Sequence, residues 1–313
     1  MPIKRLTASP IIYPKLDDRY GENINGPSLI KVPDWVENPL GRYYLYFAHH
    51  NGLFIRMAFA DDLTGPYTSY SPGVLSLEDT PFQRHIASPD IKINHTQQKI
   101  IMHYHGPVQP QEVPYPHPQA TAYAESEDGL SFHSDRVYLG ESYIRTFFWE
   151  GYHYGFSGGG LRRWLRTRDP REPFEEGPTL DIAGESFVNP QAYVSYTPEV
   201  LNASRIRHVG LHHRGPELDI YYSCVRDAPE RIKRTTVNLD GDWTTWHGTS
   251  HQEILRPELT CEGRNLPIAP SRSGAQTGQV HELRDPYIYE EDERCYMVYS
   301  IAGESGLMIA EII

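Results

Sequence analysis

Acidic, histidine and arginine side chains recur in this sequence at two kinds of position, just before one class of short apolar segments and just after another. The first class holds Asn25, Asp90, Glu141, Glu185, Asn189, Glu282, Arg284 and Asp285. The second class holds His49, His50, His103, His105, Ser157, His212, His213, Arg214 and Ser300. Carboxyl and imidazole groups transfer protons in acid–base catalysis, and guanidinium groups bind planar oxyanions. These residue types therefore suit a catalytic or binding site if the fold gathers them.

The elements that must position these residues form one short pattern, which is repeated five times. In each copy a turn leads into an apolar strand, and a short gap leads to a strand that is rich in Tyr and Phe. The paired segments are 25–30 and 43–47, 88–93 and 100–104, 142–145 and 152–156, 189–194 and 208–212, and 284–289 and 295–299. Repetition of strand-forming units at this period is typical of a β-propeller. We therefore predict an all-β fold in which residues 1–313 form a single five-bladed β-propeller domain.

The two ends of the chain predict how the ring of blades closes. In the fifth repeat, residues 306–312 have the pattern of a third strand, and no fourth strand follows them. The segment Ile3–Ile12 precedes the first repeat and has no place in it. A strand from this segment can complete the last blade and remove an exposed sheet edge. Long helices are not expected, because the helical apolar period is rare and the chain contains 26 prolines.

Antiparallel pairing then predicts where the polar residues meet. If the first strand of each blade starts at one face of the ring, the second strand returns to that face. Residues that precede first strands and residues that follow second strands should therefore converge near the axis. A few convergent polar groups on a rigid scaffold are what a small-molecule pocket requires, so we predict an axial pocket.

The bulk composition limits the partners of the chain. A net charge of -12 argues against nucleic acid or an anionic membrane surface as the main partner. Cys224, Cys261 and Cys295 have no metal-type spacing and are interpreted as thiols. No signal or membrane-spanning pattern is present, so a cytoplasmic location is the default; a signal peptide removed beforehand would leave a secreted or periplasmic protein with the same sequence. A homo-oligomer is one option, in which a loop of one subunit completes the pocket of another.

At this point the pattern resembles the five-bladed β-propeller glycoside hydrolases, family 43 and the related family 117. The resemblance spans about residues 25–313. Ser88-Pro89-Asp90-Ile91-Lys92 is similar to the second-blade motif of family 43, in which an Asp tunes the acid and orients the substrate. Residues 57–67 are similar to a frequent third-strand ending in those enzymes. The resemblance implies hydrolysis of a glycosidic bond in an oligosaccharide or polysaccharide fragment, with inversion.

The sequence departs from the family pattern at the first catalytic position. The family's base is an Asp directly before Pro-Ser, and Gly26 stands there in this chain, beside Asn25. Glu141 is the nearest match to the general acid, with Tyr143 in place of the expected proline. Arg284-Asp285-Pro286 is similar to the Arg-Asp-Pro motif of the five-bladed invertase-like enzymes, where the Asp holds sugar hydroxyls.

These observations give each candidate residue an expected role. An inverting hydrolase needs an acid for the leaving oxygen and a base for water, with carboxyls roughly 6.5–9.5 Å apart. We predict Asp285 or Asp90 as the base or orienting carboxylate and Glu141 as the acid, with a histidine as the main substitute for the acid. The predicted substrate-binding residues are Asn25, His49, His50, His105, Arg145, His212, His213 and Arg284. No cofactor is required, and the resemblance implies that a structural divalent cation can occupy the central channel; no residue is assigned as a metal ligand.

Two other functions fit the same fold. A glycoside phosphorylase would need one carboxylic acid and an Arg/His anion site, and it would explain the missing base. A catalytically silent glycan-binding propeller would also explain the missing base, because a fold alone never establishes activity. Dependence on phosphate separates the first alternative from hydrolysis, and the absence of any turnover separates the second.

Overall fold

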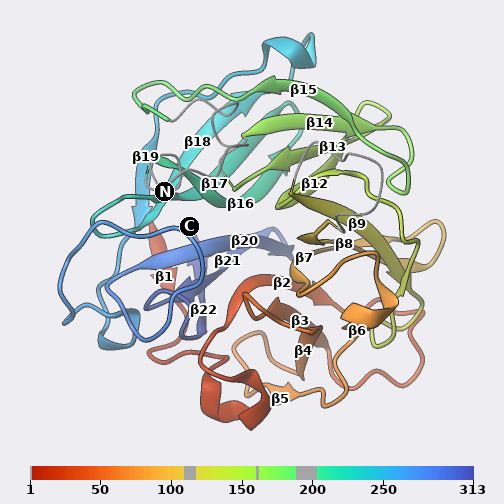
Figure 1. Cartoon of the computed structure of the whole chain (residues 1–313), viewed down its shortest axis with the longest axis horizontal. Helices are drawn as coiled ribbons and strands as arrows, with labels where there is room; N and C mark the ends of the chain where they lie inside the picture. Colours follow the sequence, from red (N-terminus) through yellow and green to blue (C-terminus); the bar gives the residue numbers. More distant parts are fainter. Residues whose placement is uncertain (1, 109–117, 160–161, 188–202) are drawn as a thin grey trace.

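The computed structural model describes residues 2–108, 118–159, 162–187 and 203–313, and it forms a ring of five antiparallel sheets (Figure 1). Blade I contains β2 (Asn25–Lys31), β3 (Tyr43–Ala48), β4 (Phe54–Ala60) and β5 (Thr68–Ser69), with β6 (Leu75–Ser76) also on β4. Blade II contains β7 (Ala87–Asn94), β8 (Lys99–Pro107), β9 (Gln119–Ser126) and β10 (His133–Ser134), with β11 (Gly140–Glu141) also on β9. The predicted all-β five-bladed propeller is therefore confirmed.

The other three blades repeat the same meander. Blade III contains β12 (Ile144–Trp149), β13 (Tyr152–Ser157), β14 (Arg163–Thr167) and β15 (Glu175–Thr179). Blade IV contains β16 (Arg205–Arg214), β17 (Glu217–Val225), β18 (Ile232–Asn238) and β19 (Gln252–Leu255). Blade V contains β20 (Leu283–Glu291), β21 (Arg294–Ile301), β22 (Leu307–Ile312) and β1 (Ile3–Arg5).

The only helices among the described residues are single 3-10 turns. They are η1 (Pro14–Leu16), η2 (Asp18–Tyr20), η3 (Leu77–Asp79), η4 (Trp243–Thr245) and η5 (Thr260–Glu262). Within the described part of the chain, no helix is long and apolar enough to span a bilayer.

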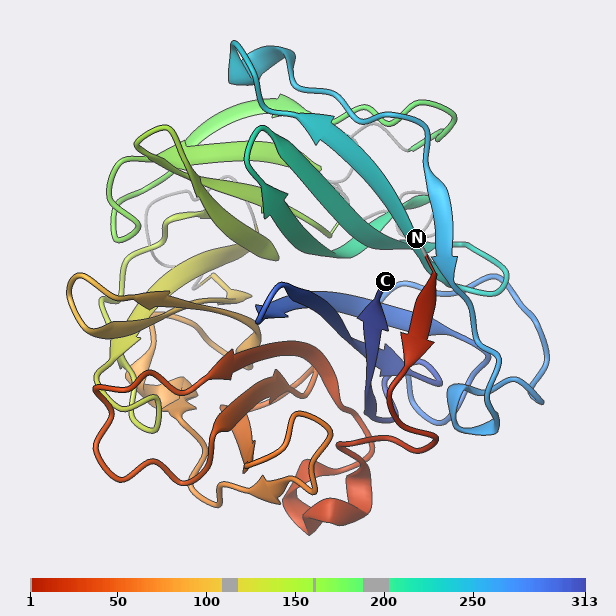
Figure 2. The same cartoon turned by 180° about the vertical axis from the view of Figure 1, so that it is seen from behind.

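The N-terminal strand closes the ring, as predicted. β1 pairs antiparallel with β22, with Ile3 opposite Ile312 and Arg5 opposite Ala310. Figure 2 shows the two ends of the chain side by side in blade V. β1 thereby covers the edge of β22 that would otherwise be exposed. The Arg5 side chain adds an ion pair to Glu262 at 2.7 Å.

The fourth blade differs from the prediction. The sequence predicts 208–212 as a second strand that follows a first strand at 189–194. In the structure, residues 208–212 belong to β16, the innermost strand of its blade, and 189–194 lie outside the described residues. The second strand of this blade is β17. β16 and β17 are both apolar, so their composition does not reveal which comes first in the blade.

Aromatic side chains fill the spaces between blades. Between blades III and IV, Phe147, Trp164 and Trp246 are buried in one cluster, and the ring centroids of the two tryptophans lie 5.3 Å apart.

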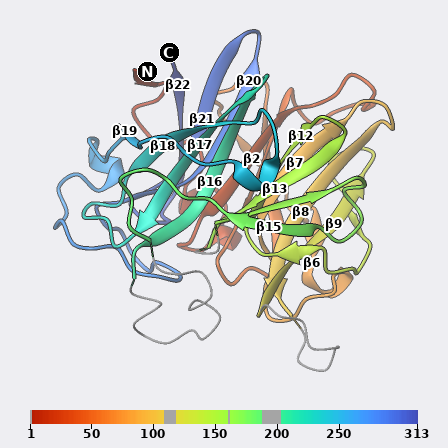
Figure 3. The ribbon, with the colours of Figure 1, turned by 90° about the horizontal axis from the view of Figure 1, so that it is seen from above.

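Figure 3 shows the ring of five blades edge-on. We call the face at which the first strands begin the start face, and the opposite face the far face. The rigid packing between blades fixes the positions of side chains at both faces.

Candidate functional site

Irregular pairing near the start of the first strands directs side chains toward the axis. The registers of β2, β7, β16 and β20 with their second strands each shift near the first strand's beginning. In three of these shifts the residue before a proline has a positive φ: 57° at Gly26, 48° at Ser88 and 51° at Asp285. Bulges of this kind re-aim side chains, and strained non-glycine residues cluster at functional sites. Of these three matched positions, only that of Asp285 carries a carboxylate.

The Gly26 position is too crowded for a side chain. A Cβ atom built on Gly26 would lie 3.0 Å from the Cα and from the Oγ of Ser88. Any larger residue would also have to adopt the positive φ. Blades I and II therefore approach each other closely at the first-blade position where the family 43 pattern has an Asp and this chain has Gly26.

Asp285 is buried and tightly held. Its side chain is 1% exposed, and Oδ2 accepts a hydrogen bond of 3.0 Å from the Ser300 hydroxyl. Oδ1 lies 2.6 Å from Nδ1 of His208, within the register shift of β16. Burial alone would raise the pKa of Asp285, but His208, Arg207 and Arg284 outweigh burial, so its pKa lies well below the usual range. Asp285 is therefore an ionised carboxylate that orients an imidazole.

Two further rings extend from His208. The His208 ring centroid lies 4.6 Å from that of Tyr143, which lies 3.9 Å from that of His105. His105 is buried, and neither of its ring nitrogens has a hydrogen-bond partner among the described residues. Burial, with smaller contributions from His85 and His208, keeps the pKa of His105 well below its usual value. Both ring nitrogens are shielded from solvent, so His105 is a neutral, buried imidazole packed against Tyr143.

A buried ionic network lies next to this group. Arg284 donates to Glu282 and, at 3.0 Å, to Glu304, and it is fully buried. Arg207 makes two hydrogen bonds to Glu230, of 2.8 and 2.9 Å. Both arginines are therefore paired with carboxylates. The predicted use of Arg284 to bind a substrate anion would require it to leave these partners.

Three predicted residues of blade I lie beside the same network. Asn25 donates to the side-chain oxygen of Asn23 at 2.9 Å, and Asn23 donates to Glu304. His50 Nδ1 lies 3.9 Å from a Glu304 oxygen, and its pKa is lowered, mainly by burial. His49 accepts a hydrogen bond from the Asn51 amide, and burial is also the largest cause of its lowered pKa. The structure thus places Asn25, His49 and His50 at the start face.

Asp90 lies further along β7 than Ser88, which is the residue of blade II that corresponds to Asp285. Asp90 Oδ2 accepts from both the amide and the hydroxyl of Thr146, at 2.8 and 2.7 Å. Oδ1 lies 3.4 Å from Lys92 Nζ and 3.8 Å from Arg145 Nη1. Ser88, and not Asp90, occupies the place in blade II that Asp285 occupies in blade V. The contacts of Asp90 join blades II and III.

Arg145 fills the centre of the ring. Its guanidinium donates to the carbonyls of Val209 at 3.3 Å, Pro27 at 3.2 Å and Pro89. Its Cζ lies 5.4 Å from the ring centroid of Tyr287 in blade V. Residues of all five blades therefore meet at one buried cation. Carbonyl oxygens can bind Ca²⁺, but these three already accept from Arg145, so they do not fit the structural cation that the resemblance implies.

Glu141 is buried two residues before Tyr143. Its Oε2 accepts a hydrogen bond of 2.7 Å from Ser157, and its Oε1 lies 2.8 Å from Arg163 Nε. Ser157 ends the second strand of blade III, so this pair follows the predicted convergence of strand starts and strand ends.

His212 and His213 lie away from the start face. They stand near the end of β16, which begins at the start face, so the expectation that they follow a second strand is wrong. His213 instead lines a groove of about 620 Å³ on the far face with Lys92, Phe147 and Tyr287. The structure brings together Asn25, His49, His50, His105, Arg284 and Asp285, but not these two histidines.

Sequence reasoning missed His208 and Tyr143 as site residues. Both fall inside predicted strand segments, Tyr143 in 142–145 and His208 in 208–212, and neither precedes a proline or ends a second strand in the predicted arrangement. The assignment of blade IV hid His208, since it placed the start of a first strand at residue 189. The Asp-Pro step at 285–286 was the signal that could have directed attention to a partner in the neighbouring blade.

Comparisons with known proteins place the chain in a family. No protein-family model matches it. An uncharacterized protein of Acanthamoeba polyphaga mimivirus is 37% identical to this chain, in an alignment that covers 93% of this chain and 83% of that protein.

Solved structures share the fold at much lower identity. A family 43 glycoside hydrolase of Xanthomonas citri in complex with xylose has a TM-score of 0.63 and 13% identity, covering 99% of this chain and 91% of that one. A β-xylosidase/α-arabinofuranosidase of family 43 from a compost metagenome has a TM-score of 0.64 and 12% identity, covering 99% and 95%. An exo-1,5-α-L-arabinanase from a bovine ruminal metagenome has a TM-score of 0.53 and 14% identity, covering 93% of each. The chain therefore belongs to the same family as the mimivirus protein and has the five-bladed propeller fold of the family 43 glycoside hydrolases.

Proposed function

We propose that this protein hydrolyses a glycosidic bond in an oligosaccharide at the start face of the propeller, with Asp285 and His208 at the centre of the site. The observation that carries the proposal is the buried, ionised Asp285 on a strained bulge, 2.6 Å from the imidazole of His208. An oriented imidazole is the commonest acid–base group in enzymes. The fold shared with family 43 glycosidases supports the reaction class.

In the proposed reaction His208 is the general base. Asp285 holds Nδ1, so Nε2 is the nitrogen that takes a proton from the attacking water, and Asp285 stabilises the imidazolium that forms. The water oxygen bonds to the anomeric carbon as the bond from that carbon to the leaving oxygen breaks. Glu141 supplies the proton for the leaving oxygen; His208 then releases its proton to solvent and Glu141 takes one up from solvent, which restores both groups. For this role the Glu141 carboxylate has to release its ion pair with Arg163 and take up a proton.

Inversion is part of the proposal. A base that activates water and an acid on the other side of the bond give a single displacement, as in inverting glycosidases. The anomeric configuration of the first product, followed by proton NMR during turnover, tests this step. A retained configuration would contradict it.

Hydrolysis is favoured over phosphorolysis by the state of the arginines. Phosphorolysis needs a cationic site for inorganic phosphate. Arg207 is bound by Glu230, and Arg284 by Glu282 and Glu304, so both charges are already compensated. Arg145 donates to three backbone carbonyls. Among the described residues nearest the axis, these cations offer no open phosphate site.

The substrate class follows from the neighbours and from the site. Structures of related fold hold xylose and xylotriose, which supports a carbohydrate substrate and makes pentose oligosaccharides the first to test. Tyr143, which is partly exposed and in ring contact with His208, offers an aromatic surface for an uncharged sugar. An uncharged substrate is also consistent with the compensated arginines.

A product screen tests the proposal. Wild type, Asp285→Asn and His208→Gln are incubated with xylan-, arabinan- and other plant-derived oligosaccharides, with and without phosphate. Release of sugar by the wild type, independent of phosphate and lost in both variants, is the expected result. Turnover that depends on phosphate would identify a phosphorylase. Sugar binding without turnover on any substrate would identify a silent glycan-binding propeller.

A further inference from the structure

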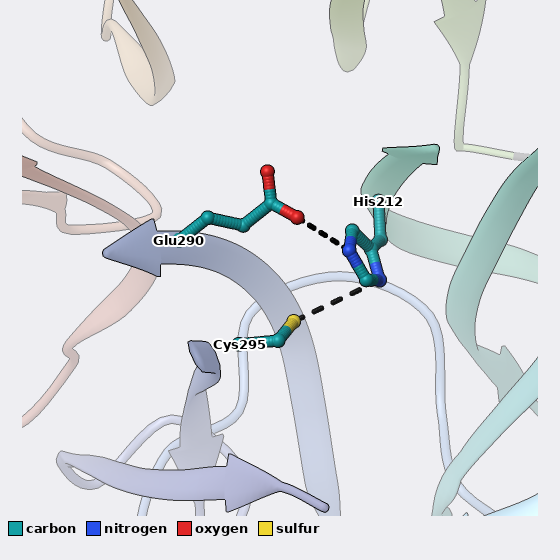
Figure 4. A group of neighbouring side chains, drawn as sticks. All are labelled: His212, Glu290 and Cys295. Carbon is teal, nitrogen blue, oxygen red and sulfur yellow. Dashed lines mark hydrogen bonds and ion pairs between the residues drawn. The ribbon is translucent and has the colours of Figure 1, made fainter. Parts of the chain in front are cut away.

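A second group of reactive side chains lies at the far face, between blades IV and V. His212 stands near the end of β16, Glu290 near the end of β20 and Cys295 near the start of β21. Glu290 and Cys295 face each other directly across the β20–β21 pair. Figure 4 shows that both of their side chains point toward the imidazole of His212.

The spacing of these three residues suits a metal ion. One ligand atom from each residue lies within 4.8 Å of those from the other two. Cys295 Sγ lies 3.8 Å from His212 Nδ1. In a tetrahedral zinc site, bonds of about 2.0–2.1 Å to nitrogen and 2.3 Å to sulfur place those two atoms roughly 3.5 Å apart. A small movement of either side chain would therefore bring both onto one ion.

We propose that His212, Glu290 and Cys295 bind a borderline-soft divalent cation, for which Zn²⁺ is the best fit, with water as the fourth ligand. Hard cations such as Ca²⁺ and Mg²⁺ select all-oxygen ligand sets, whereas a mixed nitrogen, oxygen and sulfur set selects zinc and its neighbours in the first transition row. On binding, the S–H bond of Cys295 breaks and its proton goes to solvent. The carboxylate of Glu290 leaves His212 Nε2 and turns to the ion. No group is oxidised or reduced.

An ion can reach the cluster from solvent. The side chain of Glu290 is 56% exposed, and it lines the far-face groove of about 620 Å³. His212 is buried, which positions one ligand firmly while the others adjust. The ion would join the inner strand of blade IV to two strands of blade V. This role does not depend on the site at the start face, so it stands whether or not the protein cleaves sugars.

Calorimetric titration of the full-length, reduced and chelator-treated protein with ZnCl₂ tests the proposal. The expected result is one ion per chain, with binding weakened by more than about tenfold in Cys295→Ser and in His212→Gln. Cys261→Ser is the matched control, because Cys261 is also a partly buried free thiol but lies outside the cluster. Its affinity should equal that of the wild type.

Two outcomes would overturn the proposal. One is the absence of stoichiometric zinc binding by the wild type, and the other is undiminished binding by Cys295→Ser. If that variant does not fold, Co²⁺ loaded into the wild type and into Cys261→Ser gives an independent reading. Ligation by the Cys295 thiolate predicts a near-ultraviolet sulfur-to-cobalt charge-transfer band in both proteins, and its absence from both would also overturn the proposal.

Discussion

At the residue scale, the proposed function makes His208 and Asp285 one unit, because a carboxylate oxygen of Asp285 lies 2.6 Å from Nδ1 of the imidazole. We expect Asp285→Asn and His208→Gln each to lower kcat/KM by about 10²–10⁴-fold on a substrate found in the screen. Residues that act as a unit are strongly non-additive, so the double variant should be little worse than either single one. Steady-state kinetics of the four proteins measures this. Losses that multiply in the double variant would show independent roles.

His103 makes stability dependent on pH. Burial lowers its pKa to about 4, although Asp90 and the carbonyl of Pro170 oppose this shift. The unfolded chain, with a pKa of about 6.5, binds the proton more readily. The contribution of His103 to the free energy of unfolding is therefore fully present above about pH 6.5. It decreases as the pH falls from 6.5 toward 4, by up to about 3 kcal/mol.

Urea unfolding of His103→Gln and His133→Gln between pH 7.5 and 4.5 checks this dependence. His133 is exposed and is the matched control. The free energy of unfolding of His103→Gln should fall less steeply with decreasing pH than that of wild type and of His133→Gln. Equal slopes in all three proteins would assign the acid sensitivity to other groups, of which buried His105 is the first candidate.

The same scale shows what residue types alone could predict. Asp285 was found from its Asp-Pro step, and the bulge that makes this step special has the same form at Ser88-Pro89. Asp90 was selected by resemblance, yet it lies two residues beyond the matched position, where Thr146 and Lys92 bind it. Side chains of a strand alternate between faces, so the position of a carboxylate depends on register, which a motif does not fix.

At the element scale, Arg145 connects strands of different blades. Arg145→Met would leave the buried carbonyls of Pro27, Pro89 and Val209 without their donor, and each unsatisfied group costs about 1–3 kcal/mol. We expect destabilisation by about 3 kcal/mol or more, measured by urea unfolding. Arg294→Met, which removes an exposed ion pair with Glu311, should change stability by less than about 1 kcal/mol. Similar effects of both variants would rule out a special role for the central guanidinium.

Strand order within a blade was the element-level feature that the sequence could not specify. The strands of blades I, II and V were predicted within a few residues, because a proline lies near the start of each first strand, at Pro27, Pro89 and Pro286. In blade IV, Asn189-Pro190 imitates that signal, and β16 begins without a proline at Arg205. The segment 208–212, predicted as a second strand, is part of the first strand of its blade, so His212 and His213 lie at the far face and not at the start face.

At the scale of the whole molecule, ring closure depends on three residues of β1. Deleting residues 1–12 would expose the edge of β22 along its pairing with Ile3, Lys4 and Arg5, and it would leave buried Glu262 without Arg5. An unpaired edge is a template for association with other chains, so the truncated protein should form dimers or larger aggregates. Light scattering after size-exclusion chromatography measures this.

Arg5→Met separates the two contributions to closure, since it removes the ion pair and leaves the strand. Breaking a buried pair is destabilising, because Glu262 stays buried without its cation. Glu262 also accepts hydrogen bonds from the amides of Glu258 and Leu259, however, so part of its charge remains compensated. We therefore expect Arg5→Met to be less stable than wild type and to keep the wild-type assembly state. If the chain without residues 1–12 also kept the wild-type assembly state, β1 would contribute to stability only, and an exposed edge of β22 would not cause association.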